Sequence, residues 1–408
     1  MRSRILSGIN SIPWRSIKEA LRKKRVPEYL RRIIDSYLSK RCIVCRTIDG
    51  RMARRSVEAR VPLGTVFGPL FWNFAYDSTF KVNREMGCRI ICYADDTLII
   101  ATAEDAPTAA ILAGIRVTRI LSRIERLKLR VSEEKTEAVL FHGRTRPVFF
   151  PFVSVGNCRI KLANSMKYLG IYIDNRWIFR DHFAYVEAKV SKVTLALCRL
   201  VPKLKGPMEG KRQLYSKVIQ SVLSYGASIW CDVFDASKEA QRSLRRVQRT
   251  LAIRVIAAYR TMSCDAALLL AGIPVLHITA MCRKGVYERS TAFKIRGEWS
   301  KEAVAEIEKS EHIALCHRWE DYLQDRSLFG QRTIEAVRPK FSEWITRTHG
   351  SRNYYMFQLF TGHGSFGHFL FGIRKKERMN LAPSTATIRI LLNTRCKRAP
   401  LGPRRAPS

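Results

Sequence analysis

The sequence has 408 residues, of which 46% are hydrophobic and 10% aromatic, so we expect two or three folded domains and exclude a wholly disordered chain. Its 73 Lys and Arg residues against 35 Asp and Glu residues give a formal net charge of +38, which predicts a polyanionic partner, foremost nucleic acid. The 11 cysteines are scattered, no apolar run is long enough to cross a membrane and no secretory signal is recognisable. These features argue against a disulfide framework and a membrane protein, and we expect a nuclear or cytoplasmic location.

The first 60 residues are strongly basic, with 17 Lys and Arg against 5 Asp and Glu. Between Trp14 and Leu38 the apolar residues recur at helical spacing and predict two helices broken near Pro27. Basic residues occupy the other helix faces, which are either ordinary solvated faces or a surface that follows a phosphate backbone. Cys42 and Cys45 have metal-ligand spacing, but no second pair follows at zinc-site distance, so we interpret them as ordinary thiols.

A loop rich in Gly and Pro covers residues 60–70 and leads into an apolar, helix-like run at 71–75. Gly64 and Gly68 leave backbone amides uncovered by side chains, and Thr65 adds a hydroxyl. The loop is therefore suited to a close approach to a phosphate or a base. Most loops of this composition are simple turns, so this one alone is weak evidence of a binding site.

The most informative stretch is Cys92–Asp96, which lies between two apolar runs at 89–91 and 97–100. The runs predict two short strands around a tight turn, which places Asp95 and Asp96 at the tip of a hairpin. Two adjacent carboxylates against apolar strands repel each other unless a divalent cation binds them, so the pair predicts a metal site. A solvated Asp-Asp turn is the alternative that these five residues alone leave open.

The next segments alternate helix and strand. Residues 107–127 predict a helix, and its expected apolar face consists of Ile111, Ile115, Ile120, Ile124 and Leu127. A strand is expected at 138–141 and a second hairpin at 166–173. This order predicts an α+β fold, with helices packed on one face of a small antiparallel sheet.

The pattern from 183 to 304 is almost wholly helical, with helices expected at 190–200, 214–229, 244–258 and 266–270. Tyr225 and Trp230 are interpreted as core residues and not as platforms for base stacking. Residues 374–405 contain 10 Lys and Arg and one acid with little apolar periodicity. We therefore expect a disordered tail that holds phosphate groups nonspecifically.

Four motifs together resemble those of the reverse transcriptases of non-LTR retrotransposons, in the same order and at similar spacing. They are Val-Pro-Leu-Gly-Thr-Val-Phe-Gly-Pro at 61–69, Tyr-Ala-Asp-Asp at 93–96, Lys-Thr-Glu at 135–137 and Tyr-Leu-Gly at 168–170. The sequence is similar to the Pol proteins of type-1 retrotransposable elements and their Jockey-like relatives over nearly its whole length. Segments at 225–230, 258–263 and 361–364 favour this branch over retroviral or telomerase enzymes.

The resemblance implies a partial right-hand polymerase. Its expected parts are a ferredoxin-like palm over 1–175, an all-α thumb or connection over 176–345, a C-terminal segment with the Thr-Gly-His-Gly motif over 346–380 and a basic tail over 381–408. It implies RNA-directed DNA polymerisation in target-primed reverse transcription, by two-metal nucleotidyl transfer with Mg²⁺ or Mn²⁺. The implied partners are an RNA template, a DNA primer or target, and dNTPs.

The resemblance also assigns roles to residues. Asp95 and Asp96 match the metal ligands of the hairpin, and Lys135 matches a lysine that protonates the leaving pyrophosphate, with an ordinary solvated lysine as the alternative. The other matched positions are expected to contact substrate (Tyr93, Gly64, Thr65, Ile9 and Leu63) or to form the primer grip (Tyr168, Leu169 and Gly170).

Some positions depart from the family. Residues 8–14 match the segment after the family's first palm aspartate, so Arg4 stands where that carboxylate is expected. A cation there repels metal ions, and we expect the chain to be catalytically inactive. Ile9 replaces an aromatic residue that excludes the ribose 2′-hydroxyl, and Leu63 replaces a Gln. No fingers or endonuclease domain is recognisable, which favours an N-terminally truncated fragment.

The tail supports a separate hypothesis. Residues 384–395 can be encoded by codons that, read two nucleotides later, spell a Cys- and His-containing sequence like the zinc-knuckle-like cluster of these elements. We therefore hypothesise a frameshift near residue 380, which sequencing of the locus would test.

Two functions stay open at this point. The first is an RNA-directed DNA polymerase. The second is a nucleic-acid-binding remnant without catalysis, which the net charge and Arg4 favour. An RNA-directed RNA polymerase is disfavoured because those enzymes usually carry Gly-Asp-Asp at the hairpin.

Overall fold

The structure is a computed structural model that describes residues 2–6, 12–57, 59, 65–77, 87–143, 152–155, 158–200, 209–347 and 354–361, with the backbone alone at 2–6, 130, 132–135, 197–200, 209, 354–355 and 358–359. The chain divides into two units, Met1–Ile178 and Phe179–Ser408. We call them the sheet unit and the helical unit. The predictions for the Gly-His-Gly part of the C-terminal motif and for the basic tail lie outside the described residues.

The sheet unit mixes short strands with helices. Its elements are β1 (Arg2–Leu6), α2 (Trp14–Lys23), α3 (Glu28–Leu38), β2 (Cys42–Arg46), β3 (Met52–Ser56), α4 (Phe67–Tyr76), β4 (Cys88–Tyr93), β5 (Asp96–Ala101), α5 (Ala106–Arg126), β6 (Arg130–Val139), β7 (Val153–Val155), β8 (Cys158–Ile160), β9 (Leu162–Ala163), β10 (Ser165–Tyr168) and β11 (Ile171–Asp174). The two helices predicted around Pro27 are confirmed as α2 and α3.

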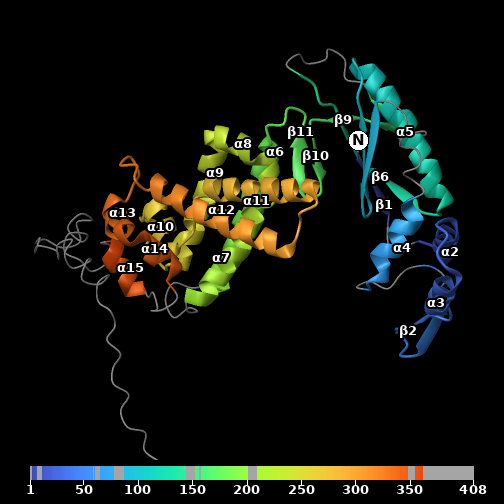
Figure 1. The fold of residues 1–408 in the computed structure, drawn as a ribbon, viewed down its shortest axis with the longest axis horizontal. Coiled ribbons are helices and arrows are strands. Elements are labelled where there is room, and N and C mark those ends of the chain that lie inside the picture. Colours follow the sequence, from blue (N-terminus) through green and yellow to red (C-terminus); the bar gives the residue numbers. More distant parts are fainter. Residues whose placement is uncertain are drawn as a thin grey trace, which may run out of the picture. The chain divides into compact units, whose positions relative to one another are not determined.

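A five-stranded sheet with the order β4-β5-β1-β6-β9 forms the centre of this unit (Figure 1). β1 is antiparallel to both of its neighbours, and β4 is antiparallel to β5. β9 runs parallel to β6, so the predicted antiparallel sheet has one parallel edge. Both predicted hairpins are confirmed as β4-β5 and β10-β11, whereas β1, β9 and the pairs β2-β3 and β7-β8 were not predicted.

Helix α5 packs along this sheet and contacts β5, β6 and β7 (Figure 1). Asp105 caps the N-terminus of this helix: its carboxylate accepts a 2.8 Å hydrogen bond from the backbone N–H of Thr108, and this bond lowers the pKa of Asp105. The predicted apolar face is right in its second half, where Ile120 and Ile124 are buried. It is wrong in its first half, where Ile111 is 63% exposed and smaller residues face inward.

The close approach of β7 explains the small residues on α5. A Cβ added to Gly114 would lie 2.9 Å from the backbone carbonyl oxygen of Ser154 in β7, and a backbone atom cannot rotate away. We therefore expect Gly114→Ala to lower the free energy of unfolding by about 1–3 kcal/mol, although Ala favours helix more than Gly. Urea unfolding followed by circular dichroism measures this. Gly210→Ala in α7, where nothing lies within 4 Å, is the control, and equal effects would contradict the prediction.

The described part of the helical unit consists of helices. They are α6 (Arg180–Leu200), α7 (Glu209–Leu223), α8 (Ala227–Ala236), α9 (Lys238–Val255), α10 (Cys264–Ala271), α11 (Leu276–Arg296), α12 (Lys301–Tyr322), α13 (Gln331–Val337), the 3₁₀ helix η2 (Arg338–Lys340), α14 (Phe341–Thr346) and α15 (Tyr354–Thr361). Among the described residues no single helix has the length and apolar composition of a membrane span, and only α10 and α11, bent by 50°, meet these criteria as a pair.

The single helix predicted at 214–229 is wrong, because α7 and α8 are separated by a turn at Gly226. Gly226 has a φ of +66°, a left-handed conformation that glycine adopts without strain. Trp230 is buried as predicted, and its Nε1 donates a 2.9 Å hydrogen bond to the backbone carbonyl of Tyr225. The side chain of Tyr225 is 54% exposed, so the prediction that it is a core residue is wrong.

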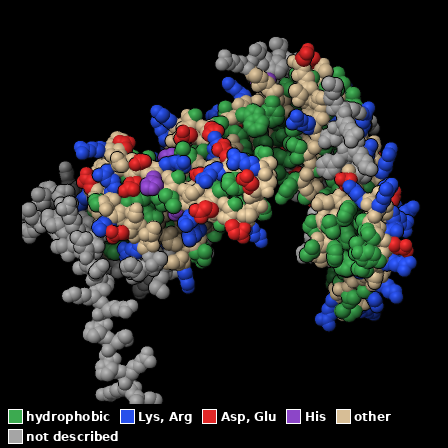
Figure 2. All heavy atoms as spheres, in the orientation of Figure 1, with side chains coloured by type: hydrophobic (Ala, Val, Ile, Leu, Met, Phe, Trp, Pro, Cys, Tyr) green, Lys and Arg blue, Asp and Glu red, His purple; other side chains and the backbone are tan. Residues whose placement is uncertain are grey.

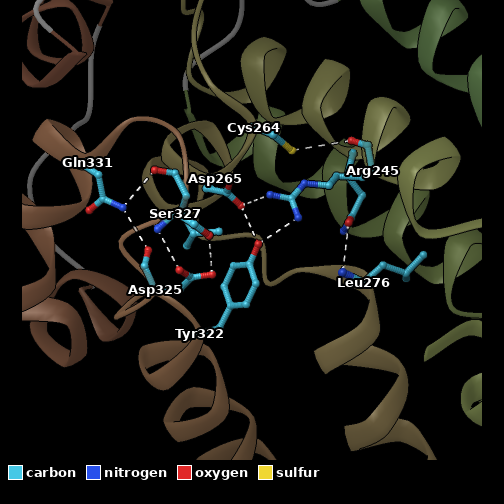
Figure 3. Close-up of polar contacts among 10 residues, drawn as sticks. Arg245, Cys264, Asp265, Leu276, Tyr322, Asp325, Ser327 and Gln331 are labelled. Carbon is cyan, nitrogen blue, oxygen red and sulfur yellow. Dashed lines mark hydrogen bonds and ion pairs between the residues drawn. The ribbon is translucent and has the colours of Figure 1, made fainter. Parts of the chain in front are cut away.

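A buried polar cluster connects α9, α10 and α12 (Figure 3). The guanidinium of Arg245 donates to a carboxylate oxygen of Asp265 and, at 2.9 Å, to the hydroxyl of Tyr322. That hydroxyl in turn donates to the same Asp265 oxygen at 2.9 Å. Burial, with the Asp265 carboxylate second, raises the pKa of Tyr322 well above its usual range, so the phenol stays protonated. The cluster fixes three helices through one carboxylate.

Candidate functional site

The acidic pair lies at the tip of the β4-β5 hairpin, as predicted. Tyr93 and Asp96 are register partners at the ends of the two strands, so Ala94 and Asp95 form a two-residue turn. Ala94 has a φ of +49°, as such tight turns require. Both carboxylates are half-buried, whereas Tyr93 is 64% exposed. The turn therefore holds two carboxylates and an accessible aromatic ring on one hairpin.

Helix α4 supports this hairpin through a polar network that was not predicted from the sequence. The hydroxyls of Tyr76 and Thr97 lie 2.8 Å apart, and the hydroxyl of Thr97 also donates to the sulfur of Cys92 at 3.7 Å. Burial raises the pKa of Tyr76, with a smaller contribution from the carboxylate of Asp95. Burial also raises the pKa of Cys92. These two supporting groups are therefore neutral.

The central strand β1 brings Arg4 directly beside the acidic pair. In the register of β1 with β5, Arg4 lies opposite Asp96 and Ser3 lies opposite Thr97. On its other side, Arg4 lies opposite Ser132 of β6. Positions directly opposite each other in an antiparallel pair are the nearest cross-strand neighbours. An arginine position therefore adjoins one of the two candidate metal ligands.

A site for a pair of divalent ions requires several carboxylates, including one that bridges the two ions. Among the described residues, no group of three or more His, Cys, Asp or Glu side chains is placed to hold a metal ion. Asp95 and Asp96 supply two carboxylates, and the neighbouring register position on β1 is Arg4. Within the described side chains, this set does not fit a two-metal site.

Several other predicted site residues are placed only in part. Thr65 lies just before α4, and its backbone carbonyl accepts a 3.2 Å hydrogen bond from the N–H of Gly68 at the start of that helix. Ile9, Leu63 and Gly64 lie outside the described residues, so their contacts with substrate stay predictions.

The backbone of Lys135 lies in an irregular part of β6. Arg4 pairs with Ser132 but Arg2 pairs with Glu137, where a regular ladder would reach only residue 134, so β6 has a bulge between these two pairs. The side chain of Lys135 is outside the described part, and its proposed role in proton transfer stays a prediction.

The predicted primer grip forms the turn of the β10-β11 hairpin. Leu169 has a φ of +45° and Gly170 a φ of +89°, so both turn residues are left-handed. Tyr168 precedes them and is half-buried. β10 contacts β6 of the five-stranded sheet, whereas β10 and β11 form a separate two-stranded sheet. The structure thus places the two predicted functional hairpins in one unit.

The Cys42 and Cys45 pair lies on β2. Residues three positions apart on a strand point to opposite faces, so these two thiols do not converge on one metal ion. Arg54 Nε donates a 3.0 Å hydrogen bond to the sulfur of Cys42.

In the sheet unit a carboxylate hairpin, supported by a helix, thus belongs to a sheet with helices packed beside it. Residues 5–173 match the reverse transcriptase (RNA-dependent DNA polymerase) family, and this segment is a reverse transcriptase domain.

The chain is related to the Pol proteins of non-LTR retrotransposons of the R1 and jockey groups. It is 25% identical over 353 residues to the 115 kDa protein in the type-1 retrotransposable element R1DM of Drosophila melanogaster, which covers 83% of this chain and 33% of the relative. It is 28% identical over 218 residues to the retrovirus-related Pol polyprotein from the type-1 retrotransposable element R1 of Bradysia coprophila. This alignment covers 52% of this chain and 21% of the relative. It is 26% identical over 216 residues to the RNA-directed DNA polymerase from the mobile element jockey of Drosophila melanogaster. This alignment covers 51% of this chain and 23% of the relative. The chain spans a third or less of the length of these relatives.

Proposed function

We propose that this chain is the palm and thumb portion of an RNA-directed DNA polymerase of a non-LTR retrotransposon, with the palm in the sheet unit and the thumb in the helical unit. The observation that carries the proposal is the Tyr93–Asp96 hairpin tip within residues that match the reverse transcriptase family. The RNA template and the DNA primer are the expected partners, and the net charge of +38 favours binding of their phosphate backbones.

The proposal includes the loss of catalysis in this chain. Reverse transcriptases use divalent metal ions, which polarise the reacting phosphate when bound. Here the supporting network of Tyr76 and Thr97 holds the hairpin, but the adjoining β1 position contributes Arg4 in place of a carboxylate. A guanidinium opposes the binding of divalent cations and cannot act as their ligand.

A second candidate function is nucleic-acid binding without polymerisation. The register of Arg4 against Asp96 favours it, because the same position that weakens metal binding adds positive charge for a polyanion. The two candidates differ in whether restoring one carboxylate at the metal site also restores primer extension.

We expect Arg4→Asp to increase the affinity for Mn²⁺ at least about tenfold, because a third carboxylate replaces a cation beside Asp96. Electron paramagnetic resonance of free Mn²⁺ measures this without relying on activity. Arg2→Asp, which makes the same charge change opposite Leu98, is the matched control. Primer extension on an RNA template with Mg²⁺ and dNTPs is then compared for the two variants and the unmodified chain, with Asp95→Ala as the inactive reference.

Each outcome is informative. Metal binding with extension by Arg4→Asp supports a polymerase disabled at this position, and metal binding without extension supports the nucleic-acid-binding remnant. Equal Mn²⁺ affinities for Arg4→Asp and Arg2→Asp would contradict the assignment of the hairpin as a metal site. Extension by the unmodified chain that Asp95→Ala abolishes would contradict the proposed loss of catalysis.

A further inference from the structure

A small basic cleft lies between α2 and α3 in the sheet unit. It has a volume of about 140 Å³, and its charged lining consists of Lys18 and Arg22 from α2 and of Glu28, Arg31, Arg32 and Asp35 from α3. Lys and Arg side chains crowd the edge of the molecule over these two helices (Figure 2). Four cations and two acids thus line a space that has room for a few water molecules, at about 30 Å³ each.

The two acids of the cleft are already paired. Asp35 lies 2.9 Å from the ammonium of Lys18, and Glu28 lies 2.9 Å from the guanidinium of Arg32. Within the described part of the chain, the side chains of Arg22 and Arg31 have no ion pair or hydrogen bond. The Nε of Arg31 is buried and lacks an acceptor. The lining of the cleft therefore contains two cations, Arg22 and Arg31, that have no partner among the described residues.

A buried guanidinium N–H without an acceptor is costly, and an anionic oxygen would satisfy it. Arginine matches the oxygens of a phosphate with its planar set of donors. The volume suits one phosphate group and is too small for a whole nucleotide. We propose that Arg22 and Arg31 bind a single phosphate of a nucleic-acid backbone in this cleft. This inference rests on the proposed function and names one of its contact points.

Binding of a short fluorescein-labelled RNA–DNA hybrid, measured by fluorescence anisotropy at several salt concentrations, tests the inference. The variant Arg22→Gln/Arg31→Gln removes the two unpaired cations of the cleft. The control Arg15→Gln/Arg25→Gln removes two exposed cations of the same region that do not line it. Circular dichroism verifies folding, and Arg22→Gln alone, at an exposed position, provides a second variant that leaves the buried Nε in place.

We expect the cleft variant to reduce the slope of log K against log salt by about 1, which corresponds to one phosphate contact, while the control keeps the slope of the unmodified chain. The single variant Arg22→Gln should reduce this slope by less than the double cleft variant does. Equal losses in the cleft variant and in the control would overturn the proposal, because they would reflect the general positive charge alone. Absence of any binding to the hybrid by the unmodified chain would also overturn it.

Titration with inorganic phosphate by calorimetry separates the two sources of a phosphate group. Phosphate binding that the cleft variant abolishes, without a change in the salt slope for the hybrid, would assign the cleft to free phosphate and overturn the backbone assignment. These measurements need no dNTPs and no catalysis. A failure of primer extension therefore leaves the inference standing. Equal losses in the cleft variant and the control overturn the inference alone, whereas absence of any hybrid binding by the unmodified chain counts against the proposed function as well.

Discussion

An Asp265→Asn variant is expected to lower the free energy of unfolding of the helical unit by about 3 kcal/mol, at the lower end of the range for broken buried ion pairs. The side chain of Asp265 is 2% exposed and accepts hydrogen bonds from Arg245 and Tyr322, which belong to two other helices (Figure 3). Removing its charge leaves the guanidinium of Arg245 without its partner. The loss is at the lower end because the Arg245 side chain is 33% exposed, so water compensates part of it.

Hydrogen exchange of the full chain, read on the amides of α9, α10 and α12, measures this loss in the helical unit alone. Asp232→Asn is the matched control, since Asp232 is 77% exposed and its pair with Lys284 should contribute within about 0.5 kcal/mol. A double variant Arg245→Met/Asp265→Leu removes both charges and should recover much of the stability. Equal effects of Asp265→Asn and Asp232→Asn would show that the buried cluster is not a stabilising element.

The second large effect concerns acid stability and originates at His182 in α6. The residue is 2% exposed, its Nδ1 is buried without a hydrogen-bond partner, and its ring lies 6.2 Å from that of Trp230. Burial lowers its pKa to about 4 from the ordinary value of 6.5. Between pH 6.5 and about pH 4, His182 therefore binds a proton in the unfolded chain but not in the folded chain. The free energy of unfolding therefore keeps its full value, as far as His182 is concerned, above pH 6.5, and it falls by about 3 kcal/mol as the pH decreases toward 4.

A His182→Phe variant keeps an aromatic ring in this environment and cannot be protonated. We expect its unfolding free energy to change less between pH 7 and pH 5 than that of the unmodified chain. Urea unfolding followed by circular dichroism at both pH values provides the comparison. His312→Gln, at an exposed position of α12, should leave the pH dependence unchanged. Burial also lowers the pKa of His277, so part of the acid sensitivity should persist in His182→Phe. Identical pH dependence with and without His182 would refute this explanation.

The local parts of the structure could be predicted from the sequence because their signals are local. Alternating apolar runs around Asp95 and Asp96 indicated the hairpin, and the break at Pro27 indicated two helices. The prediction for α5 failed at Ile111 because helical spacing alone does not reveal which neighbour approaches the helix. Gly114 faces β7, and only its missing side chain allows that contact.

The rest of the candidate site depends on contacts between distant segments. Nothing in the sequence near Tyr76 indicates that its hydroxyl lies against Thr97, and the strand β1 has no pattern of its own that predicts its two partners. The resemblance identified Arg4 as the position of a missing carboxylate, whereas only the register of β1 places it beside Asp96. Long-range strand register is therefore the information that the sequence lacked.

The middle place of β1 in its sheet governs the order in which a nascent chain can fold. The β4-β5 hairpin can close within a few residues of its own synthesis, but Arg4 must wait for Asp96 and Ser132, about 90 and about 130 positions later. Pairing over such separations is slow because a long loop must close first. Until β6 has left the ribosome, β1 or β5 exposes an unpaired edge to other chains. Aggregation during synthesis is therefore expected to compete with the folding of this domain.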